Sequence, residues 1–348
     1  MTRTVDFHYY AVRDGANFCE LFAPEGGEPS ITMDNSGSIK TKLSGSFLPP
    51  EREVDWLRDE IRPVLVLDGA EYHLGRFLPV NVSTVRSATS TRIQVEALDR
   101  GWIVRDCRTE DLLYFAAGTK YLSAIGSVLI SCGIADVSVV ESDEVLAENR
   151  EDWPVGTSCL DIVNQLLSEI NYKDLWFDKD GMARLEPKPA PLAGNLLHTL
   201  DERQVTSLMI PGMSQNTDIH SAPNVFICVC SNADKNGAMR AVAENTNPQS
   251  PLSITRRGRR ITKVVQLKNI ASQAELQLYA DRMVTDSLLR GDVFNVTSCL
   301  LPGFGVDDLT ALRYGEISAI CRETAWSMDL RVGGQMSHTL ERVVLNLE

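Results

Sequence analysis

The sequence predicts a mainly β protein in which two strand-rich regions flank a smaller α/β module. In residues 1–110 and 191–348, apolar residues alternate with polar ones between turns rich in Gly, Pro and Asp, as they do in antiparallel strands. Residues 111–190 instead contain two stretches with apolar residues at helical spacing. We therefore expect three domains, 1–110, 111–190 and 191–348, which suits a chain of 348 residues.

The first region contains a hairpin and a half-buried strand. Apolar runs at 64–67 and 72–78 flank Asp68-Gly69, a pair that favours a tight turn between antiparallel strands. Residues 93–97 alternate strictly between apolar and polar side chains, which predicts a strand with one solvated face. Such strands fit an antiparallel barrel or sandwich.

Two helices are predicted in the middle module. The first has Thr119 as a candidate cap and Gly133 just past its end. The second follows Ser158, which has the spacing of a capping box with Asp161. The segment EPKPAPLAG, residues 186–194, is typical of a linker and closes the module.

The stretch WFDKDGMARLEP partly resembles a calcium-binding loop. Glycine is the sixth residue of an EF-hand loop, so Gly181 would put Trp176 first and Pro187 last. Neither is an acid, so the loop lacks the end ligands that calcium requires. Asp180-Gly181 instead predicts a hairpin turn with both residues at positive φ.

The third region returns to strands and contains one helix, 272–290. Ser272 and Glu275 have the spacing of a capping box, and Gly291 ends the pattern. The candidate strands are 223–231, 261–267, 292–301, 316–334 and 338–347.

The chain is acidic, with 47 Asp and Glu against 34 Lys and Arg and a net charge of −13. Such a surface repels phosphate backbones, which argues against sequence-independent nucleic-acid binding. No apolar run is long enough for a membrane span, and the N-terminus lacks the apolar core of a secretory signal. We expect a protein made in the cytoplasm with no membrane anchor. One basic stretch, Arg256–Arg260, is expected to form a solvated loop tip. The alternatives are that it holds a phosphate or contacts the carboxylates of an acidic neighbouring subunit.

Free, half-buried thiols are expected for all eight cysteines, because a protein without a secretory signal stays in a reducing compartment. Cys228 and Cys230 share one face of a predicted strand, where core packing is favoured over a zinc site. A zinc site would need two further ligands, and no second Cys or His pair has suitable spacing. The cysteines are Cys19, Cys107, Cys132, Cys159, Cys228, Cys230, Cys299 and Cys321.

No catalytic motif is present: no phosphate-binding loop, dinucleotide fingerprint, nucleophile elbow or HExxH. We therefore assign no catalytic, cofactor-binding or metal-binding residue, expect no cofactor and predict that the protein is not an enzyme. A triad assembled from distant segments stays open. The histidines, widely separated in sequence, are His8, His73, His198, His220 and His338. Carboxylates predicted to lie on solvated faces include Asp59, Glu60, Glu141, Asp143 and Glu144.

Across most of residues 40–340, the sequence resembles the baseplate hub or tail-tip hub proteins of long-tailed bacteriophages, prophages and related contractile machines. Packing and turn positions carry the resemblance through their order and spacing. The N-terminal 35 residues match least. The similar segments are 42–79, 118–134, 153–187, 223–229, 247–254, 272–288 and 325–336.

The resemblance implies two antiparallel β-barrel domains like those of the tail-tube protein, with the small α/β module between them. It implies a homotrimer that closes the distal tail tube, adapts sixfold to threefold symmetry and mounts the spike or fibre for DNA passage. The implied partners are a distal tail or tail-tube protein, the tape measure protein and a central spike or tail fibre, with only transient contact with passing DNA. The implied location is the virion tail tip, after assembly in the cytoplasm of the bacterial host.

Two other functions stay open at this point. One is a cytoplasmic hydrolase or lyase on a β-rich scaffold, with a composite site that the sequence does not reveal. The other is a tail-tip adhesin that binds the host through surface loops. Exposed aromatic residues usually supply such contacts, whereas Trp153 and Trp176 lie beside capped helices or turns and are expected in the core.

Overall fold

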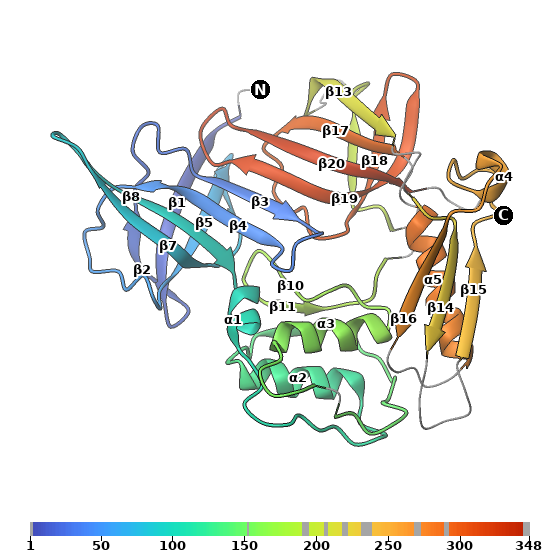
Figure 1. Cartoon of the computed structure of the whole chain (residues 1–348). Coiled ribbons are helices and arrows are strands. Elements are labelled where there is room, and N and C mark those ends of the chain that lie inside the picture. Colours follow the sequence, from blue (N-terminus) through green and yellow to red (C-terminus); the bar gives the residue numbers. More distant parts are fainter. Residues whose placement is uncertain are drawn as a thin grey trace. The chain divides into compact units, whose positions relative to one another are not determined.

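The computed structural model describes residues 3–151, 153–189, 195–204, 208–217, 222–230, 239–267, 273–288 and 292–343. The chain divides into two compact units (Figure 1). The first comprises Met1–Lys188, Ser298–Asp307 and Thr324–Ser337, and the second comprises Pro189–Thr297, Asp308–Glu323 and His338–Glu348. The three-domain division drawn from the sequence stays a prediction.

An antiparallel sheet forms the larger part of the first unit, in the order β3-β4-β8-β7-β5-β1-β2, with β6 added on β5. The ends of β4 and β2 meet, since the amide of Leu48, just after β4, donates to the carbonyl of Phe22, just after β2, at 2.8 Å. Phe47, Phe77 and Leu65 are fully buried in its core. The strands are β1 (Val5–Arg13), β2 (Ala16–Leu21), β3 (Ser30–Asp34), β4 (Thr41–Phe47), β5 (Glu60–Leu67), β6 (Ala70–His73), β7 (Phe77–Arg86) and β8 (Thr91–Asp99).

Both local predictions in this region are confirmed. Asp68 and Gly69 have φ of 50° and 84° and connect β5 to β6 as a hairpin. On β8, Ile93, Val95 and Ala97 are buried while the residues between them are exposed. The second arm of the hairpin is shorter than predicted, because β6 ends at His73 and β7 begins at Phe77.

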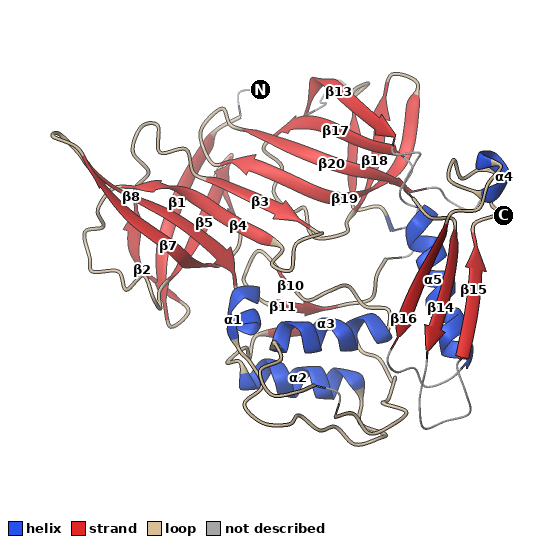
Figure 2. Ribbon diagram, viewed as in Figure 1, coloured by secondary structure: helices blue, strands red, loops and turns tan. Residues whose placement is uncertain are grey.

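The α/β module of this unit packs three helices beside a small sheet with the order β10-β11-β9 (Figure 2). The helix stop at Gly133 is confirmed: its φ is 79°, and the amide of Ile134 donates to the carbonyl of Leu129. The cap prediction is wrong, because Lys120 rather than Thr119 occupies the N-cap. The elements are α1 (Gly101–Asp106), α2 (Tyr121–Ser131), β9 (Val137–Val139), α3 (Cys159–Glu169), β10 (Trp176–Phe177) and β11 (Ala183–Leu185).

The predicted capping box at α3 is also wrong. Ser158 occupies the N-cap, but its hydroxyl accepts no bond from the helix. Instead, that hydroxyl donates to the carbonyl of Arg105 at 3.0 Å. Trp153 is buried as expected, and its indole donates to Gln165 on α3.

The second unit contains strands in the order β13-β17-β20-β19-β18-β12 and a separate sheet in the order β15-β14-β16. The β12–β18 and β14–β16 pairings are parallel. β19 and β20 contribute residues to both units. The elements are β12 (His198–Asp201), β13 (Met209–Thr217), β14 (Val225–Cys230), β15 (Met239–Glu244), α4 (Ile254–Arg257), β16 (Thr262–Leu267), α5 (Gln273–Leu288), β17 (Asp292–Cys299), β18 (Leu309–Tyr314), β19 (Ile317–Asp329) and β20 (Gln335–Val343).

The helix predicted over 272–290 is confirmed as α5, which packs on β14 and β15. Cys228 and Cys230 are fully buried in this small core beside Leu276, so the prediction of core packing is also confirmed. Ser272, Gly291 and the side chain of Glu275 lie outside the described residues.

The predicted fold class is confirmed: the protein is mainly β, with an α+β part. No described helix combines the length and the apolar composition that a membrane crossing requires.

Candidate functional site

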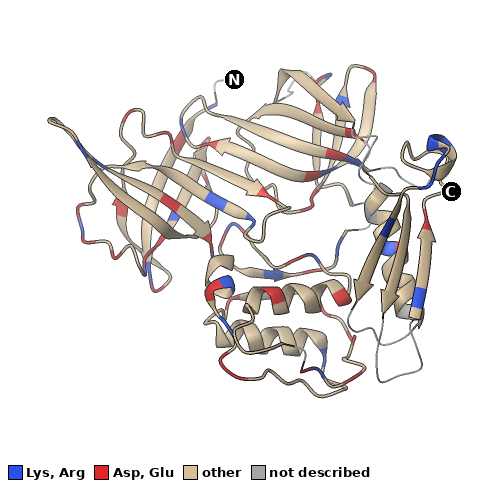
Figure 3. Cartoon of the chain, in the orientation of Figure 1, with Lys and Arg blue, Asp and Glu red and all other residues tan. Residues whose placement is uncertain are grey.

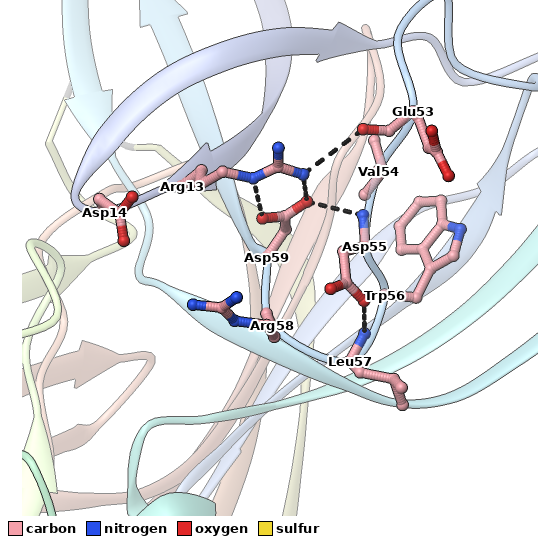
Figure 4. Close-up of a pocket in the computed structure, with 9 residues that line it drawn as sticks. All are labelled: Arg13, Asp14, Glu53, Val54, Asp55, Trp56, Leu57, Arg58 and Asp59. Atoms are coloured by element: carbon pink, nitrogen blue, oxygen red, sulfur yellow. Dashed lines mark hydrogen bonds and ion pairs between the residues drawn. The ribbon is translucent and has the colours of Figure 1, made fainter.

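An open pocket of about 630 Å³ lies in the first unit, where the turn after β1 meets the loop between β4 and β5 (Figure 4). Arg13 and Asp14 line it from the turn, and residues 53–59 line it from the loop. Asp14 and Gly15 form a tight turn with φ of 49° and 83°. That turn places the Arg13 side chain over the buried end of the loop.

Asp59 holds the pocket together. Its carboxylate accepts two hydrogen bonds from the Arg13 guanidinium, at 2.8 and 2.7 Å, and one from the amide of Asp55, at 2.7 Å. The carboxylate is 1% exposed, whereas Arg13 is about half exposed. The hydrogen bonds from Arg13 hold the pKa of Asp59 below its ordinary value and outweigh the opposing effect of burial. Asp59 is therefore a charged anchor for the loop.

The loop carries an apolar residue into solvent above this anchor. Leu57 is 88% exposed, and the neighbouring Trp56 is half-buried. The amide of Leu57 donates to the carboxylate of Asp55 at 3.1 Å, so the apex has a defined conformation. The residues that line the pocket include no histidine, cysteine or hydroxyl side chain that would act as a nucleophile or base. The pocket lining thus combines charged side chains with the apolar side chains of Val54, Trp56 and Leu57.

A second, smaller pocket of about 310 Å³ adjoins the first and is built around Glu60. Its carboxylate forms ion pairs with Arg76 and with Arg100, whose Nε lies 3.1 Å away. Arg100 also lies 3.5 Å from Asp136 and donates to the carbonyl of Gly181 at 3.0 Å. These bonds join the first sheet to the α/β module within one unit.

The prediction that Asp59 and Glu60 are solvated is therefore wrong. Both are buried and paired with arginines that lie far away in the sequence. Glu141, Asp143 and Glu144 are exposed, as predicted.

The stretch around Gly181 forms a hairpin between β10 and β11, as predicted. The predicted turn geometry is wrong, because Gly181 has φ of 79° and Asp180 does not have positive φ. The loop is longer than a two-residue turn. The carboxylate of Asp178 accepts hydrogen bonds from the amides of Asp180 and Met182, at 3.0 Å each. A Cβ on Gly181 would lie 2.6 Å from Cδ of Arg76. The hairpin thus docks against the Glu60 network.

The described histidines all pair with carboxylates, although no recognised motif in the sequence indicates these pairs. His338 Nδ1 lies 3.1 Å from Glu323, and both side chains are fully buried. His198 lies 3.1 Å from Asp308. Burial raises the pKa of Glu323, and the hydrogen bond to His338 opposes that rise. The Glu323–His338 pair is closed to solvent and packs the second unit, and His220 lies outside the described residues.

The basic stretch Arg256–Arg260 includes the end of α4 and its left-handed cap at Gly258. Arg257 donates to the carbonyl of Ala222 at 2.6 Å, and Arg260 forms a two-bond pair with Glu244 at 3.0 and 2.6 Å. Arg256 and Arg259 are exposed. A test for contact with an acidic subunit should therefore replace Arg256 and Arg259 with serine, because replacing all four would also remove internal contacts.

Solved structures cover almost the full length of this chain. A 43 kDa tail protein of prophage MuSo2 from Shewanella oneidensis matches with a TM-score of 0.70 and 10% identity, over 97% of this chain and 98% of that one. A tail protein from Neisseria meningitidis MC58 matches with a TM-score of 0.69 and 13% identity, over 97% and 96%. No protein-family model matches the sequence, and no curated protein sequence matches it significantly.

The chain has the fold of phage and prophage tail proteins. The same fold extends to a type VI secretion system component from E. coli, itself described as structurally similar to the T4 tail proteins gp27 and gp5. That protein matches with a TM-score of 0.54 and 9% identity, over 98% of this chain and 77% of that one. The resemblance drawn from the sequence is confirmed at the level of fold.

Proposed function

We propose that this protein is a structural component of a phage tail, or of a phage-tail-like particle, and forms a trimeric hub at the tail tip. In this role it closes the distal tail tube, adapts sixfold to threefold symmetry and mounts the spike or fibre for DNA passage. The full-length match to tail proteins, in which each chain covers nearly all of the other, carries the proposal. A full-length match accounts for both β regions and the α/β module together.

The chemistry of the described residues supports a role in assembly rather than catalysis. Arg13 and Asp59 are paired with each other, and the Glu323–His338 pair is buried away from any substrate. The buried carboxylates Asp59 and Glu60 anchor a loop and join two parts of one unit. These are the contacts of a scaffold.

One surface of the first unit suits contact with another copy of the chain. The β7–β8 hairpin extends beyond its sheet, and residues 83–90 are exposed on both faces (Figure 1). Residues 80–92 include two arginines and no acidic residue, in a chain whose net charge is −13 (Figure 3). An isolated two-stranded hairpin is only marginally stable in water. We therefore assign this cationic arm, residues 80–92, to docking on the acidic surface of a neighbouring protomer.

The proposed partners follow from this role. They are two further copies of the chain, a distal tail or tail-tube protein, the tape measure protein and a central spike or fibre. The protein would occupy the virion tail tip after assembly in the bacterial cytoplasm. An acidic wall suits a conduit that must release the DNA passing through it, because like charges repel.

Negative-stain electron microscopy combined with light-scattering mass on the same sample tests the proposal. We expect a threefold ring with a central channel and the mass of three chains, either alone or after addition of the proposed tail partners. A compact monomer with a deep cleft, and no ring even with those partners, would refute the hub and favour the hydrolase or lyase.

A further inference from the structure

Three cysteines that lie far apart in the sequence meet in the α/β module. Cys107 directly follows α1, Cys132 caps the C-terminus of α2, and Cys159 is the first residue of α3. Their sulfur atoms all lie within 4.8 Å of one another. All three are free thiols.

The backbone fixes the three positions. The amide of Cys159 donates to the carbonyl of Cys107 at 3.0 Å, which joins the start of α3 to the end of α1. The amide of Cys132 bonds to the last turn of α2. Cys159 is buried, whereas Cys107 and Cys132 are half-buried. Backbone hydrogen bonds thus hold the cluster in place, and two of its three cysteines are partly exposed.

From this geometry we propose that Cys107, Cys132 and Cys159 form a three-thiolate binding site for a thiophilic metal ion, Zn²⁺ or Cu(I). Metal–sulfur bonds of about 2.3 Å place the sulfurs about 3.8 Å apart around a tetrahedral ion and about 4 Å apart around a three-coordinate one, so the cluster needs a contraction of at most about 1 Å. Thiolates select these ions over harder cations. For Zn²⁺, water would be the fourth ligand.

Binding exchanges three protons for one ion, because thiolates rather than thiols are the ligands. Protons therefore compete with the metal, and the affinity should rise as the pH increases across the neutral range. The ion would join the ends of α1 and α2 to the start of α3.

The site departs from the expectation of no metal-binding residue. The sequence does not reveal it, because the ligands are separated by 24 and 26 residues and match no zinc motif. Convergence of three helix ends creates the site.

Metal titration of the full chain tests the proposal. Protein purified under reductant without chelator is analysed for bound metal, and the metal-free form is titrated with Zn²⁺, with Cu(I) and with Cd²⁺ as a spectroscopic probe. We expect one ion per chain and an ultraviolet charge-transfer band with Cd²⁺. Cys107→Ser and Cys132→Ser should each weaken binding by more than about 100-fold. Cys299→Ser, which alters an exposed cysteine outside the cluster, should bind like the wild type.

A second measurement uses the unmodified sequence, so it does not depend on how the variants fold. Mass spectrometry after brief alkylation should show that Zn²⁺ or Cu(I) protects Cys107 and Cys132 and leaves Cys299 reactive. The absence of bound metal and of the Cd²⁺ band in fully reduced protein would overturn the proposal. Equal binding by Cys107→Ser, Cys132→Ser and the wild type would overturn it as well.

Discussion

At the scale of single residues, the position of Gly181 imposes two constraints that only glycine satisfies. Its φ of 79° disfavours any Cβ, and a Cβ there would also displace Arg76 from its place beside Glu60. We expect Gly181→Ala to lower the free energy of unfolding by about 2 kcal/mol in urea denaturation. Gly126 on α2 is the matched control, because it has open space around it. Gly126→Ala should stabilise the protein by about 1 kcal/mol, and equal losses at both sites would contradict this account.

At the same scale, Asp59 should make the free energy of unfolding depend on pH. Its pKa is lower in the folded protein than in the unfolded chain, so its stabilisation is complete above about pH 3.9 and is lost as the pH falls through the folded value. Asp59→Asn should cost about 2 kcal/mol near neutral pH, because it removes the charged acceptor of hydrogen bonds from Arg13 and Asp55. Urea denaturation at about pH 7, 5 and 3 should show a constant difference from the wild type that shrinks only at the lowest pH. A difference that does not depend on pH would argue against the ion pair.

At the scale of elements, α3 shows that a capping motif in sequence does not guarantee a capping bond. The hydroxyl of Ser158 donates to the carbonyl of Arg105 and so joins α3 to α1. Ser158→Ala should therefore cost about 1 kcal/mol through that lost bond. Asp161 is exposed on the first turn, and Asp161→Ala should cost no more than about 0.5 kcal/mol through the helix dipole. Equal losses in thermal or urea unfolding would indicate a working capping box.

Elements with short-range causes were predictable from the sequence. The alternation on β8 and the Asp68-Gly69 turn depend on neighbouring residues, and both are present in the structure. Pairings between residues that are distant in the sequence could not be predicted from it. The sequence around Asp59 predicts a solvated carboxylate, because its partner Arg13 is distant in the sequence. The three thiols of the α/β module likewise form no local sequence pattern. The separate sheet of β14–β16 was also missed, because periodicity predicts strands but not their partners.

At the scale of the whole molecule, assembly of the proposed trimer should depend on the cationic arm. Replacing residues 86–91 with Asn-Gly keeps Val85 opposite Arg92 and supplies a two-residue turn, so the rest of the sheet should fold unchanged. We expect this variant to keep its thermal midpoint and to lose the trimer in light scattering. Arg86→Glu should weaken the proposed trimer, because it reverses a charge that the proposal places against the acidic surface of a neighbouring protomer.

Lys179→Glu makes the same change of charge outside the arm, at an exposed position on the β10–β11 loop, and serves as the control. It should leave the trimer intact. If the truncated variant forms rings as readily as the wild type, the arm is not the contact surface, and the exposed loop apex at Leu57 becomes the next surface to alter. If Arg86→Glu and Lys179→Glu weaken the trimer equally, net charge rather than docking of the arm controls assembly.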